Sequence, residues 1–409
     1  MGSEKKHGVN MLDVKKTNRS AVLKLVQREK AISRKEIAVK LGLTPASITI
    51  IVSELLDEGV IEELSAQISP NRKGRREILL QISSEKYAAI GVYISRHKLR
   101  ILCVDLNLNV LFETVVYTDE CRKNANAILE KLVCVINDLL KRQDLFGNRS
   151  VVGLGVSVNG IVDNVHGVSI NAFQVWQEAN IPVEDILEKS IGLPVLLTNN
   201  ICSLAHVESI LSRQENKGSL LLIKYGPGLG AALSPESNIY SAPNYKAIQL
   251  GHIAADPNGA PCVCGDCGCF ETIIHYDAVE NHLKSILSER MTPVLWELTG
   301  GDADKVTIYE VIKAFDLREK VVEQIFDRTA FYLGLAIKNT LTLLDPDGVI
   351  LYGELFENEK FKTMLLDKLT RFTEAERVRF SHYNMQLETL GPAATAVSGF
   401  FEQGGVAVH

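Results

Sequence analysis

The sequence predicts an α/β protein with a small helical head and a larger, two-lobed body. Three observations support this fold class: helical spacing of apolar residues in the head, a change near residue 87 to short apolar runs broken by turns, and a later recurrence of the same order of elements. With 409 residues, 46% of them hydrophobic and 23% charged, the chain is long enough for two or three domains with their own cores. This composition excludes a peptide hormone, a coiled-coil rod and a disordered adaptor.

The net charge of -6 hides a basic head and an acidic body. Residues 1–82 contain 15 lysines and arginines against 10 aspartates and glutamates, a formal charge of +5, which leaves −11 for the rest of the chain. A basic head indicates contact with a polyanion, although the same charge also suits an ordinary solvated surface. No run of about 18 apolar residues occurs, and the first six residues hold no apolar segment, so we expect a cytoplasmic protein without a membrane partner.

The head begins with two helices that lead into a tight turn. Apolar residues at helical spacing predict the first helix over residues 12–30. Ser33 and Glu36 form the capping-box pair that starts a second helix over residues 34–41. Gly42 then ends this helix, because glycine readily adopts the left-handed conformation that such a turn needs.

A third helix follows, capped by Thr44 and with Pro45 at its first position, where a missing N–H costs nothing. The apolar residues expected to pack inward are Ile48, Ile51, Val52, Leu55 and Leu56. The opposite face is mostly small and hydroxylated, which suits close approach to phosphates, base edges and thymine methyl groups in a major groove. The DNA-contacting residues expected on this helix are Thr44, Ala46, Ser47, Thr49, Ile50 and Ser53.

A hairpin wing is predicted after the third helix. Two β-rich runs, residues 60–64 and 78–82, flank a basic tip rich in glycine, proline and asparagine. Arg75 and Arg76 are expected to enter a minor groove, where narrow A·T tracts concentrate negative potential. The expected wing contacts with DNA are Arg72, Lys73, Arg75 and Arg76. Residues 1–82 therefore form a predicted winged helix-turn-helix DNA-binding domain, with a three-helix protein-contact module as the alternative.

The body repeats one order of elements, three strands and then helices. The expected strands are 88–94, 99–104 and 110–112 in the first copy, before a helix at 125–141, and 219–223, 228–233 and 238–240 in the second. This repetition predicts two α/β lobes with a cleft between them. We expect the first lobe over residues 83–200, with a C-terminal helix at 391–409 returning to it, and the second over 201–390.

A cluster of cysteines after His252 is the densest chemical signal. Four of the eight cysteines lie within residues 262–269, where Gly265 and Gly268 allow the chain to fold tightly. Zinc prefers four soft or borderline ligands in a tetrahedron, which one histidine and three cysteines supply. Four cysteines for three places leave one spare. The alternative is a set of reactive or buried thiols.

Gly251-His252 followed by Cys262-x-Cys264-Gly265-x-x-Gly268-Cys269-x-Glu271 resembles the signature of the ROK family of repressors, open reading frames and sugar kinases. Residues 153–163, 171–176 and 192–200 are similar, in the same order, to the family's sugar-binding segments. The head resembles the winged helix-turn-helix of the family's sugar-responsive bacterial repressors. Ile50 departs from that pattern, because those relatives often carry a basic or polar residue there.

The resemblance implies the two-lobed, actin-like (ribonuclease H-like) fold of sugar kinases. It also implies a structural Zn²⁺ held by His252, Cys262, Cys264 and Cys269, with Cys267 as the spare, and no open position for water. The residues that it implies for contacts with sugar hydroxyls are Asn171, Asn199, Asn200, Gln249, His252 and Glu271.

Two departures from the family's kinases favour binding without phosphotransfer. Those kinases place an aspartate after an asparagine as general base, where this chain has Thr198-Asn199-Asn200, and loss of such a base costs on the order of 10²–10⁴-fold. The Asp-x-Gly-x-Thr phosphate turn is replaced by Tyr-Ile-Ser-Arg-His at 93–97. The glycine loop at 225–230 suits either a phosphate site or a tight hairpin with positive φ. We therefore expect no enzymatic activity.

Asn200 and Gln249 stand where the relatives carry an aspartate and a glutamate, so the sugar pocket loses two negative charges. This change favours a neutral sugar with altered selectivity or an anionic sugar phosphate. The alternative is a pocket that no longer binds any sugar.

These expectations describe a DNA-binding transcriptional repressor of sugar-utilisation genes, released or modulated by a sugar or sugar-phosphate effector. Two protomers of a homodimer, or of a tetramer, present two heads to successive major grooves of a roughly palindromic double-stranded operator. One alternative is a regulator controlled by a protein partner, with a vestigial sugar pocket. The other is an ATP-dependent sugar kinase.

Overall fold

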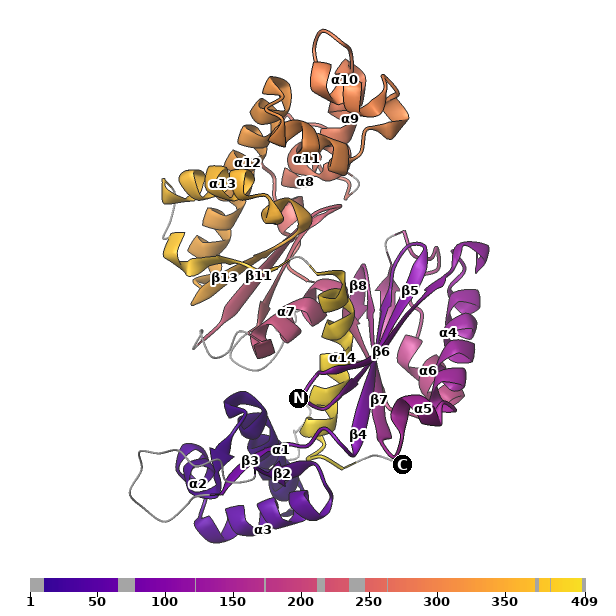
Figure 1. Cartoon of the computed structure of the whole chain (residues 1–409), viewed down its shortest axis with the longest axis vertical. Coiled ribbons are helices and arrows are strands. Elements are labelled where there is room, and N and C mark those ends of the chain that lie inside the picture. Colours follow the sequence, from indigo (N-terminus) through magenta and orange to yellow (C-terminus); the bar gives the residue numbers. More distant parts are fainter. Residues whose placement is uncertain are drawn as a thin grey trace, which may run out of the picture. The chain divides into compact units, whose positions relative to one another are not determined.

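The computed structural model describes residues 11–64, 78–121, 123–172, 174–211, 218–234, 247–262, 264–371, 375–382 and 384–406 (Figure 1). The chain forms two compact units, one of residues 1–214 with 386–409 and one of residues 215–385. The first unit contains the head and a lobe with a five-stranded sheet, and the second contains a four-stranded sheet with its helices.

The head has the three expected helices and one strand that the sequence did not predict. Its elements are α1 (Met11–Glu29), β1 (Ile32–Ser33), α2 (Arg34–Leu41), α3 (Pro45–Asp57), β2 (Ile61–Glu63) and β3 (Leu79–Ile82). The strands form a sheet in the order β1-β3-β2, antiparallel throughout. Ser33 therefore ends β1 and caps α2 at once, with the capping box to Glu36 confirmed.

The first lobe is built on a mixed sheet in the order β10-β7-β4-β5-β6. Its strands are β4 (Tyr87–Ile94), β5 (Lys98–Asp105), β6 (Val110–Tyr117), β7 (Ser150–Val158) and β10 (Val195–Asn199). β4, β7 and β10 are parallel, so their carboxyl ends meet at one edge of the sheet. A small hairpin of β8 (Ile161–Asp163) and β9 (Val168–Asn171) follows β7 directly.

Helices cover both faces of this sheet (Figure 1). They are η1 (Asp119–Cys121), α4 (Ala125–Leu140), α5 (Gln143–Phe146), α6 (Val183–Ile191), α7 (Asn200–Leu211) and α14 (Met385–Glu402). α4 and α6 pack on the face that carries Ile90, Val92 and Leu154, which forms the lobe's main apolar core. α14 lies on the opposite face, where a Cβ at Gly155 would be only 1.8 Å from the Pro392 carbonyl oxygen.

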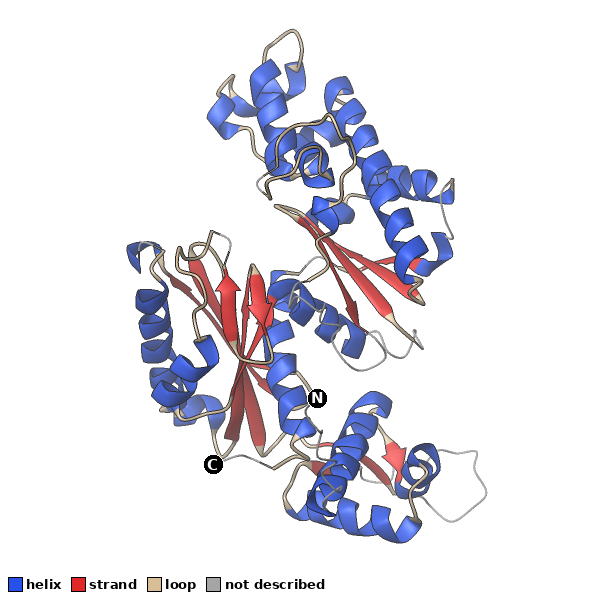
Figure 2. Ribbon diagram, turned by 180° about the vertical axis from the view of Figure 1, so that it is seen from behind, coloured by secondary structure: helices blue, strands red, loops and turns tan. Residues whose placement is uncertain are grey.

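The second unit packs its helices against a sheet in the order β12-β11-β13-β14 (Figure 2). The strands are β11 (Leu220–Tyr225), β12 (Leu229–Ser234), β13 (Gly348–Tyr352) and β14 (Val378–Phe380). The helices are η2 (Leu250–His252), α8 (Phe270–Ile274), α9 (Tyr276–Ile286), α10 (Pro293–Thr299), η3 (Ala303–Lys305), α11 (Ile308–Asp316), α12 (Lys320–Leu344), η4 (Glu354–Glu357), α13 (Glu359–Thr370) and η5 (Ala375–Arg377). Its core is rich in aromatic rings, including Phe315, Phe326 and Phe361. The expected strand at 238–240 lies outside the described residues.

The boundaries of the compact units differ from those of the expected lobes. α7 belongs to the first unit, although the expected boundary followed residue 200. The helix continues directly from β10 because Asn199 caps it. α14 begins at Met385 rather than near residue 391, and Pro392 lies in its interior instead of in a first turn. Within the described residues, no helix is both long and apolar enough to span a membrane.

Candidate functional site

The start of α3 has the geometry that its sequence predicts. Gly42 ends α2 in the left-handed conformation, with φ 64° and ψ 25°. Thr44 caps α3 by accepting a hydrogen bond from the Ser47 N–H, and Pro45 is the first helical residue. The turn between α2 and α3 is therefore fixed by local interactions, which sets the angle at which α3 is presented.

The outward face of α3 is accessible and only weakly polar. Ile48, Ile51, Val52 and Leu55 are buried, and Leu56 is half-buried. The outward residues are exposed except for Ser47, which is half-buried, and they are Thr44, Ala46, Ser47, Thr49, Ile50 and Ser53. The Thr49 hydroxyl donates to the Pro45 carbonyl at 2.8 Å, so its methyl group and the two lone pairs of its oxygen remain for a ligand.

The expected wing contacts fall in a segment outside the described residues. Arg72, Lys73, Arg75 and Arg76 belong to residues 65–77. The strands on either side, β2 and β3, pair in an antiparallel ladder that places Glu63 opposite Leu80. The base of a hairpin is therefore present.

Three of the expected sugar-binding residues gather at the carboxyl ends of the parallel strands of the first lobe. The Asn199 side-chain amide donates to the Gly160 carbonyl at 2.6 Å. Gly160 in turn lies against the Asn171 carbonyl oxygen, which would be 2.0 Å from a Cβ at residue 160. Asn171 is exposed, whereas Asn199 is buried and its side-chain oxygen accepts from the Ile201 N–H at 2.8 Å. Asn199 is thus largely occupied in capping α7.

Asn200 is available for a ligand in a way that Asn199 is not. Its side chain is 9% exposed at the first residue of α7, and its Oδ1 atom has no hydrogen-bond partner in the described structure. The buried hydroxyl of Ser157, on the neighbouring strand β7, also has no partner there. Because burying a polar atom without a partner is costly, a water or a polar ligand that bonded to either atom would be stabilised at this edge. Ser157 was not among the residues expected from the sequence, since nothing in its local pattern marks it.

The remaining expected sugar residues belong to the second unit. Gln249 precedes η2, His252 ends it, and Glu271 lies in the first turn of α8. His252 Nδ1 is 3.3 Å from Glu271 Oε2, so these two side chains are direct neighbours. The glycine loop between β11 and β12 is a tight hairpin that places Gly228 against Glu271. None of the glycines at 226, 228 and 230 has a positive φ, so the hairpin does not depend on the left-handed conformation.

The expected metal ligands come together in the same unit. The ligand atoms of His252, Cys262, Cys264 and Cys269 all lie within 4.8 Å of one another. The Cys264 and Cys269 sulfurs are 3.6 Å apart, close to the roughly 3.8 Å of two thiolates on a tetrahedral Zn²⁺ with bonds of about 2.3 Å. Cys267 is exposed and outside the group, and all eight cysteines are free. The donor set and its spacing therefore fit a tetrahedral metal ion.

The backbone of the metal loop depends on one glycine in particular. Gly268 has φ +64°, and a Cβ there would be 1.5 Å from the Asp256 carbonyl oxygen.

Burial, and then the neighbouring thiols, raise the pKa of Cys269 to about 12. A cation among these sulfurs would favour the thiolate form, so metal binding here would be accompanied by release of thiol protons.

The comparisons with known proteins agree with this architecture. Residues 89–395 match the model of the ROK family, and residues 16–62 match a winged helix-turn-helix DNA-binding model. The chain is 27% identical over 349 residues to the DNA-binding transcriptional dual regulator NagC of Escherichia coli, covering 85% of this chain and 82% of the relative. It is 24% identical over 387 residues to the xylose repressor of Caldicellulosiruptor bescii, covering 92% of each.

Solved structures show the same fold. A ROK family transcriptional regulator, described as a homologue of E. coli Mlc, matches with a TM-score of 0.82 and 22% identity, covering 96% of this chain and 97% of that one. The ROK hexokinase from Thermus thermophilus matches with a TM-score of 0.63 and 22% identity, covering 75% of this chain and 97% of that one. The family thus includes regulators and kinases. Since its family model spans most of the body and a winged helix-turn-helix precedes it, the chain belongs to the ROK family.

Proposed function

We propose that the protein is a DNA-binding transcriptional repressor of sugar-utilisation genes, whose operator binding responds to a sugar or sugar-phosphate effector. The observation that carries this proposal is the surface of α3, a capped helix with an exposed face of small and hydroxylated residues, in a head fused to a ROK body. The NagC and xylose-repressor relatives, which span most of the chain, support the same function.

The head reads double-stranded DNA through α3 and the wing. Thr44, Ser47, Thr49 and Ser53 contact phosphates and base edges, while Ala46 and Ile50 supply apolar contacts, for example to thymine methyl groups. The basic wing residues add phosphate or minor-groove contacts. Two protomers of a homodimer or tetramer bind the half-sites of a roughly palindromic operator.

The effector binds through the amides at the carboxyl ends of the first lobe's parallel strands. Asn200 provides the unpartnered acceptor, and Asn171 lies exposed across Gly160 from the adjoining residue Asn199. Gln249, His252 and Glu271 of the second unit are proposed as further sugar contacts on the strength of the family signature. An amide both donates and accepts, which suits a sugar hydroxyl.

Phosphotransfer is not part of the proposed function. Asn199 and Asn200 are amides, which do not take up the proton of a sugar hydroxyl at neutral pH, and the turn after β4 is Ser95-Arg96-His97 in place of a small acidic phosphate turn. Released ADP from purified protein, ATP and glucose, xylose or N-acetylglucosamine at a useful rate would overturn this part of the proposal.

The metal is proposed to be a structural Zn²⁺. Three thiolates and one imidazole complete its tetrahedron, so no position remains for a reactive water. When bound, the metal stabilises the fold of residues 252–271 and fixes the orientation of the His252 ring. The Nδ1 atom of that ring is 3.4 Å from the Cys262 sulfur and 3.3 Å from Glu271 Oε2, so a metal bound there would also lie close to the Glu271 carboxylate.

The test uses the full-length protein and makes no assumption about its ligands. Selection from a random double-stranded DNA library should yield an inverted repeat, and a thermal-shift screen of sugars and sugar phosphates should yield a stabilising ligand. The selected DNA and the sugar should then alter each other's affinity. If a protein partner releases the DNA and no small molecule does, the sensor half of the proposal is wrong and the DNA-binding half stands.

A further inference from the structure

Arg19 is a buried guanidinium near the middle of α1. Its side chain is 5% exposed, although it carries a full positive charge. A buried charge is costly unless it is paired and hydrogen-bonded. Arg19 meets that requirement with acceptors from two other parts of the first unit, namely α3 and the turn after α14.

Two of these acceptors belong to the proposed DNA-reading helix. Arg19 Nη1 donates to Glu54 Oε2 at 2.9 Å, and Nη2 donates to Glu58, the residue that caps the C-terminus of α3. A planar guanidinium that grips two carboxylates fixes both the rotation and the axial position of the helix that carries them. A lysine, which is a point charge, does not do this.

The third acceptor lies at the end of α14. Arg19 Nε donates to the Gly404 carbonyl at 2.7 Å. The adjoining residue Gly405 has φ +75° and lies so close to α1 that a Cβ there would be 3.0 Å from Leu23 Cδ1. Lys24, further along α1, pairs with Glu402 at 3.1 Å. The C-terminal turn therefore sits directly on α1.

α14 itself is fastened to the sheet of the first lobe. A Cβ at Gly91 would be 2.5 Å from the Ala393 nitrogen, and one at Gly155 would be 1.8 Å from the Pro392 oxygen, so only glycine permits this contact. The chain enters α14 directly on leaving the second unit, because the unit boundary falls between Met385 and Gln386. With 18 residues, α14 spans about 27 Å from that boundary to the head.

We propose that Arg19 is a positioning residue that ties the DNA-reading helix α3 to α14, so that the head and the first lobe present the operator-binding surface as one rigid body. This inference rests on the proposed function and adds the route by which the body sets the position of the head. A second contact supports the same rigid union, since the Tyr87 hydroxyl donates to the Glu58 carbonyl at 3.1 Å.

The experiment compares three full-length proteins: wild type, Arg19→Lys and, as matched control, Lys15→Ala. Lys15 also pairs with Glu54, at 2.7 Å, but its side chain is 52% exposed, and Glu54 is its only hydrogen-bond partner among the described residues. The first readout is hydrogen exchange without DNA. In Arg19→Lys, exchange in α3 and in residues 400–405 should rise together by about tenfold or more, since hydrogen bonds to charged groups are lost. In Lys15→Ala it should stay near wild type.

The second readout is one that a general loss of stability does not reproduce. Operators selected by the wild type are remade with one or two base pairs inserted between the half-sites. The wild type, with its heads held rigidly on the first lobes, should bind the lengthened operator about tenfold or more weakly, because rigid heads match only one spacing of the half-sites. Arg19→Lys should bind the original operator more weakly and yet lose at most about threefold on insertion, because a loosened head can follow the displaced half-site.

The outcomes separate the two claims. If α3 exchanges faster in Arg19→Lys while residues 400–405 do not, or if the variant is as sensitive to spacing as the wild type, the positioning role is wrong. If the wild type selects no DNA sequence, the proposed function fails, and the exchange readout still decides whether Arg19 joins the head to α14. Circular dichroism of Arg19→Lys checks its fold. Should it be unfolded, Lys24→Ala, which removes only the Glu402 pair, takes its place with the same expected direction and a smaller effect.

Discussion

Asn200 is a buried amide whose side-chain oxygen has no hydrogen-bond partner among the described residues. Buried polar atoms are usually hydrogen-bonded. The family resemblance puts Asn200 where a sugar kinase carries a catalytic carboxylate. The same side-chain shape is therefore retained without the ability to accept a proton. Its neighbour Asn199, also expected to contact the sugar, caps α7 and donates a hydrogen bond to the Gly160 carbonyl.

Asn200→Ala should weaken sugar binding by about tenfold, since a hydrogen bond to a buried acceptor contributes on the order of 1 kcal/mol or more. Isothermal titration calorimetry with the ligand found in the thermal-shift screen measures the dissociation constant of that ligand for each variant. Asn148→Ala, at an exposed position of the same unit, is the control. Unchanged affinity in Asn200→Ala, with sugar still bound, would place the ligand elsewhere.

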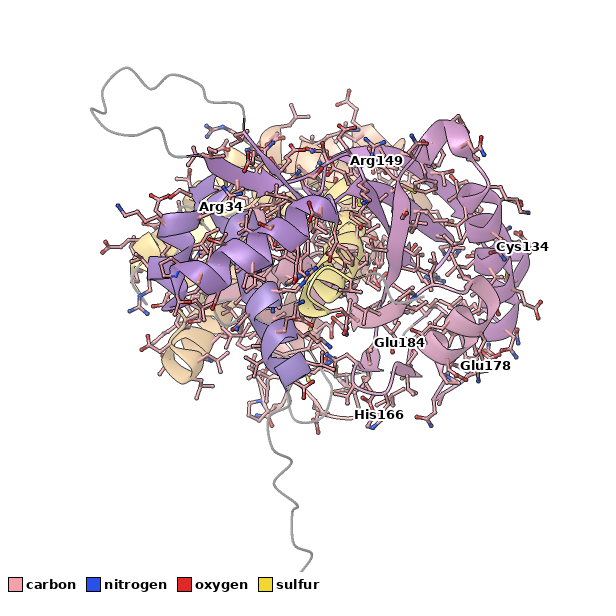
Figure 3. All side chains as sticks on the ribbon, turned by 90° about the horizontal axis from the view of Figure 1, so that it is seen from below. Arg34, Cys134, Arg149, His166, Glu178 and Glu184 are labelled. Atoms are coloured by element: carbon pink, nitrogen blue, oxygen red, sulfur yellow. The ribbon has the colours of Figure 1, made fainter. Side chains whose placement is uncertain are left out.

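Glu184, labelled in Figure 3, lies on α6, and its environment predicts that the stability of the first unit depends on pH. Its Oε1 atom accepts from the Leu197 N–H at 2.6 Å. Burial, and then the nearby charges of Glu188 and Asp163, raise its pKa from 4.5 to about 7. The folded state thus retains the Glu184 proton where the unfolded chain has lost it, and the resulting stability is lost as pH rises towards 7.

The free energy of unfolding should therefore fall between pH 5 and pH 8 by more in the wild type than in Glu184→Gln, which stays neutral. Urea unfolding at the two pH values measures the difference. Asp185→Asn, at the exposed neighbouring position, should behave like the wild type. An equal pH dependence in Glu184→Gln and wild type would show that this carboxyl does not govern it.

At the scale of elements, the metal loop offers a comparison between adjacent cysteines. Cys269→Ser should abolish stoichiometric zinc binding and lower the melting temperature, because one of four ligands is lost and the loop's fold depends on the metal. Cys267→Ser should leave zinc content and melting temperature unchanged, since Cys267 lies outside the ligand group. Elemental analysis and a thermal melt distinguish the two. If Cys267→Ser also lost its zinc, Cys267 would be a ligand and the proposed set of four ligands would be wrong.

The exposed face of α3 can be tested at Ile50, which is 60% exposed. Ile50→Ala should leave folding stability within about 0.5 kcal/mol and change which bases the selected operator prefers, because an apolar contact to DNA is lost without any loss of core packing. Val39→Ala, at the 76% exposed Val39 of α2, is the control. An unchanged selected sequence would mean that Ile50 faces away from the bases.

Elements governed by neighbouring residues could be predicted from the sequence, and elements governed by distant ones could not. Ser33, Gly42, Thr44 and Pro45 act within three or four residues, so α2 has the predicted boundaries and α3 the predicted start. The cysteines of the metal cluster lie within eight residues of one another, whereas His252, ten residues before Cys262, was assigned to them from the family signature. β1 exists only because β3 pairs with it from about 47 residues away, as Ile32 opposite Leu80 shows, and local patterns carry no such signal.

Arg19 and Ser157 show the same limit at the candidate sites. Arg19 looks like one more basic residue on an amphipathic helix, and only its contact with Gly404, 385 residues away, reveals its role. Ser157 sits in an ordinary apolar strand, and its unpartnered hydroxyl becomes visible only once β10 lies beside it.

At the scale of the whole molecule, charge and connectivity suit an operator-binding switch. The head is basic and the body acidic, so we expect the body to repel DNA and the proposed contact to be confined to the heads. The chain leaves the second unit straight into α14, whose far end meets α1 and, through Arg19, α3. A ligand that favours one arrangement of the body can shift operator affinity only by its differential affinity for the two arrangements.

The affinity of the full-length protein for its selected operator, measured with and without each sugar and sugar phosphate that raises its melting temperature, tests the central claim most directly. We predict that at least one of them changes the operator affinity by about 5- to 150-fold, the range of typical coupling free energies. The operator should raise or lower the sugar's affinity by the same factor. An operator affinity that stays constant across a broad panel, phosphorylated sugars included, would contradict the claim that this protein is a sugar-responsive repressor.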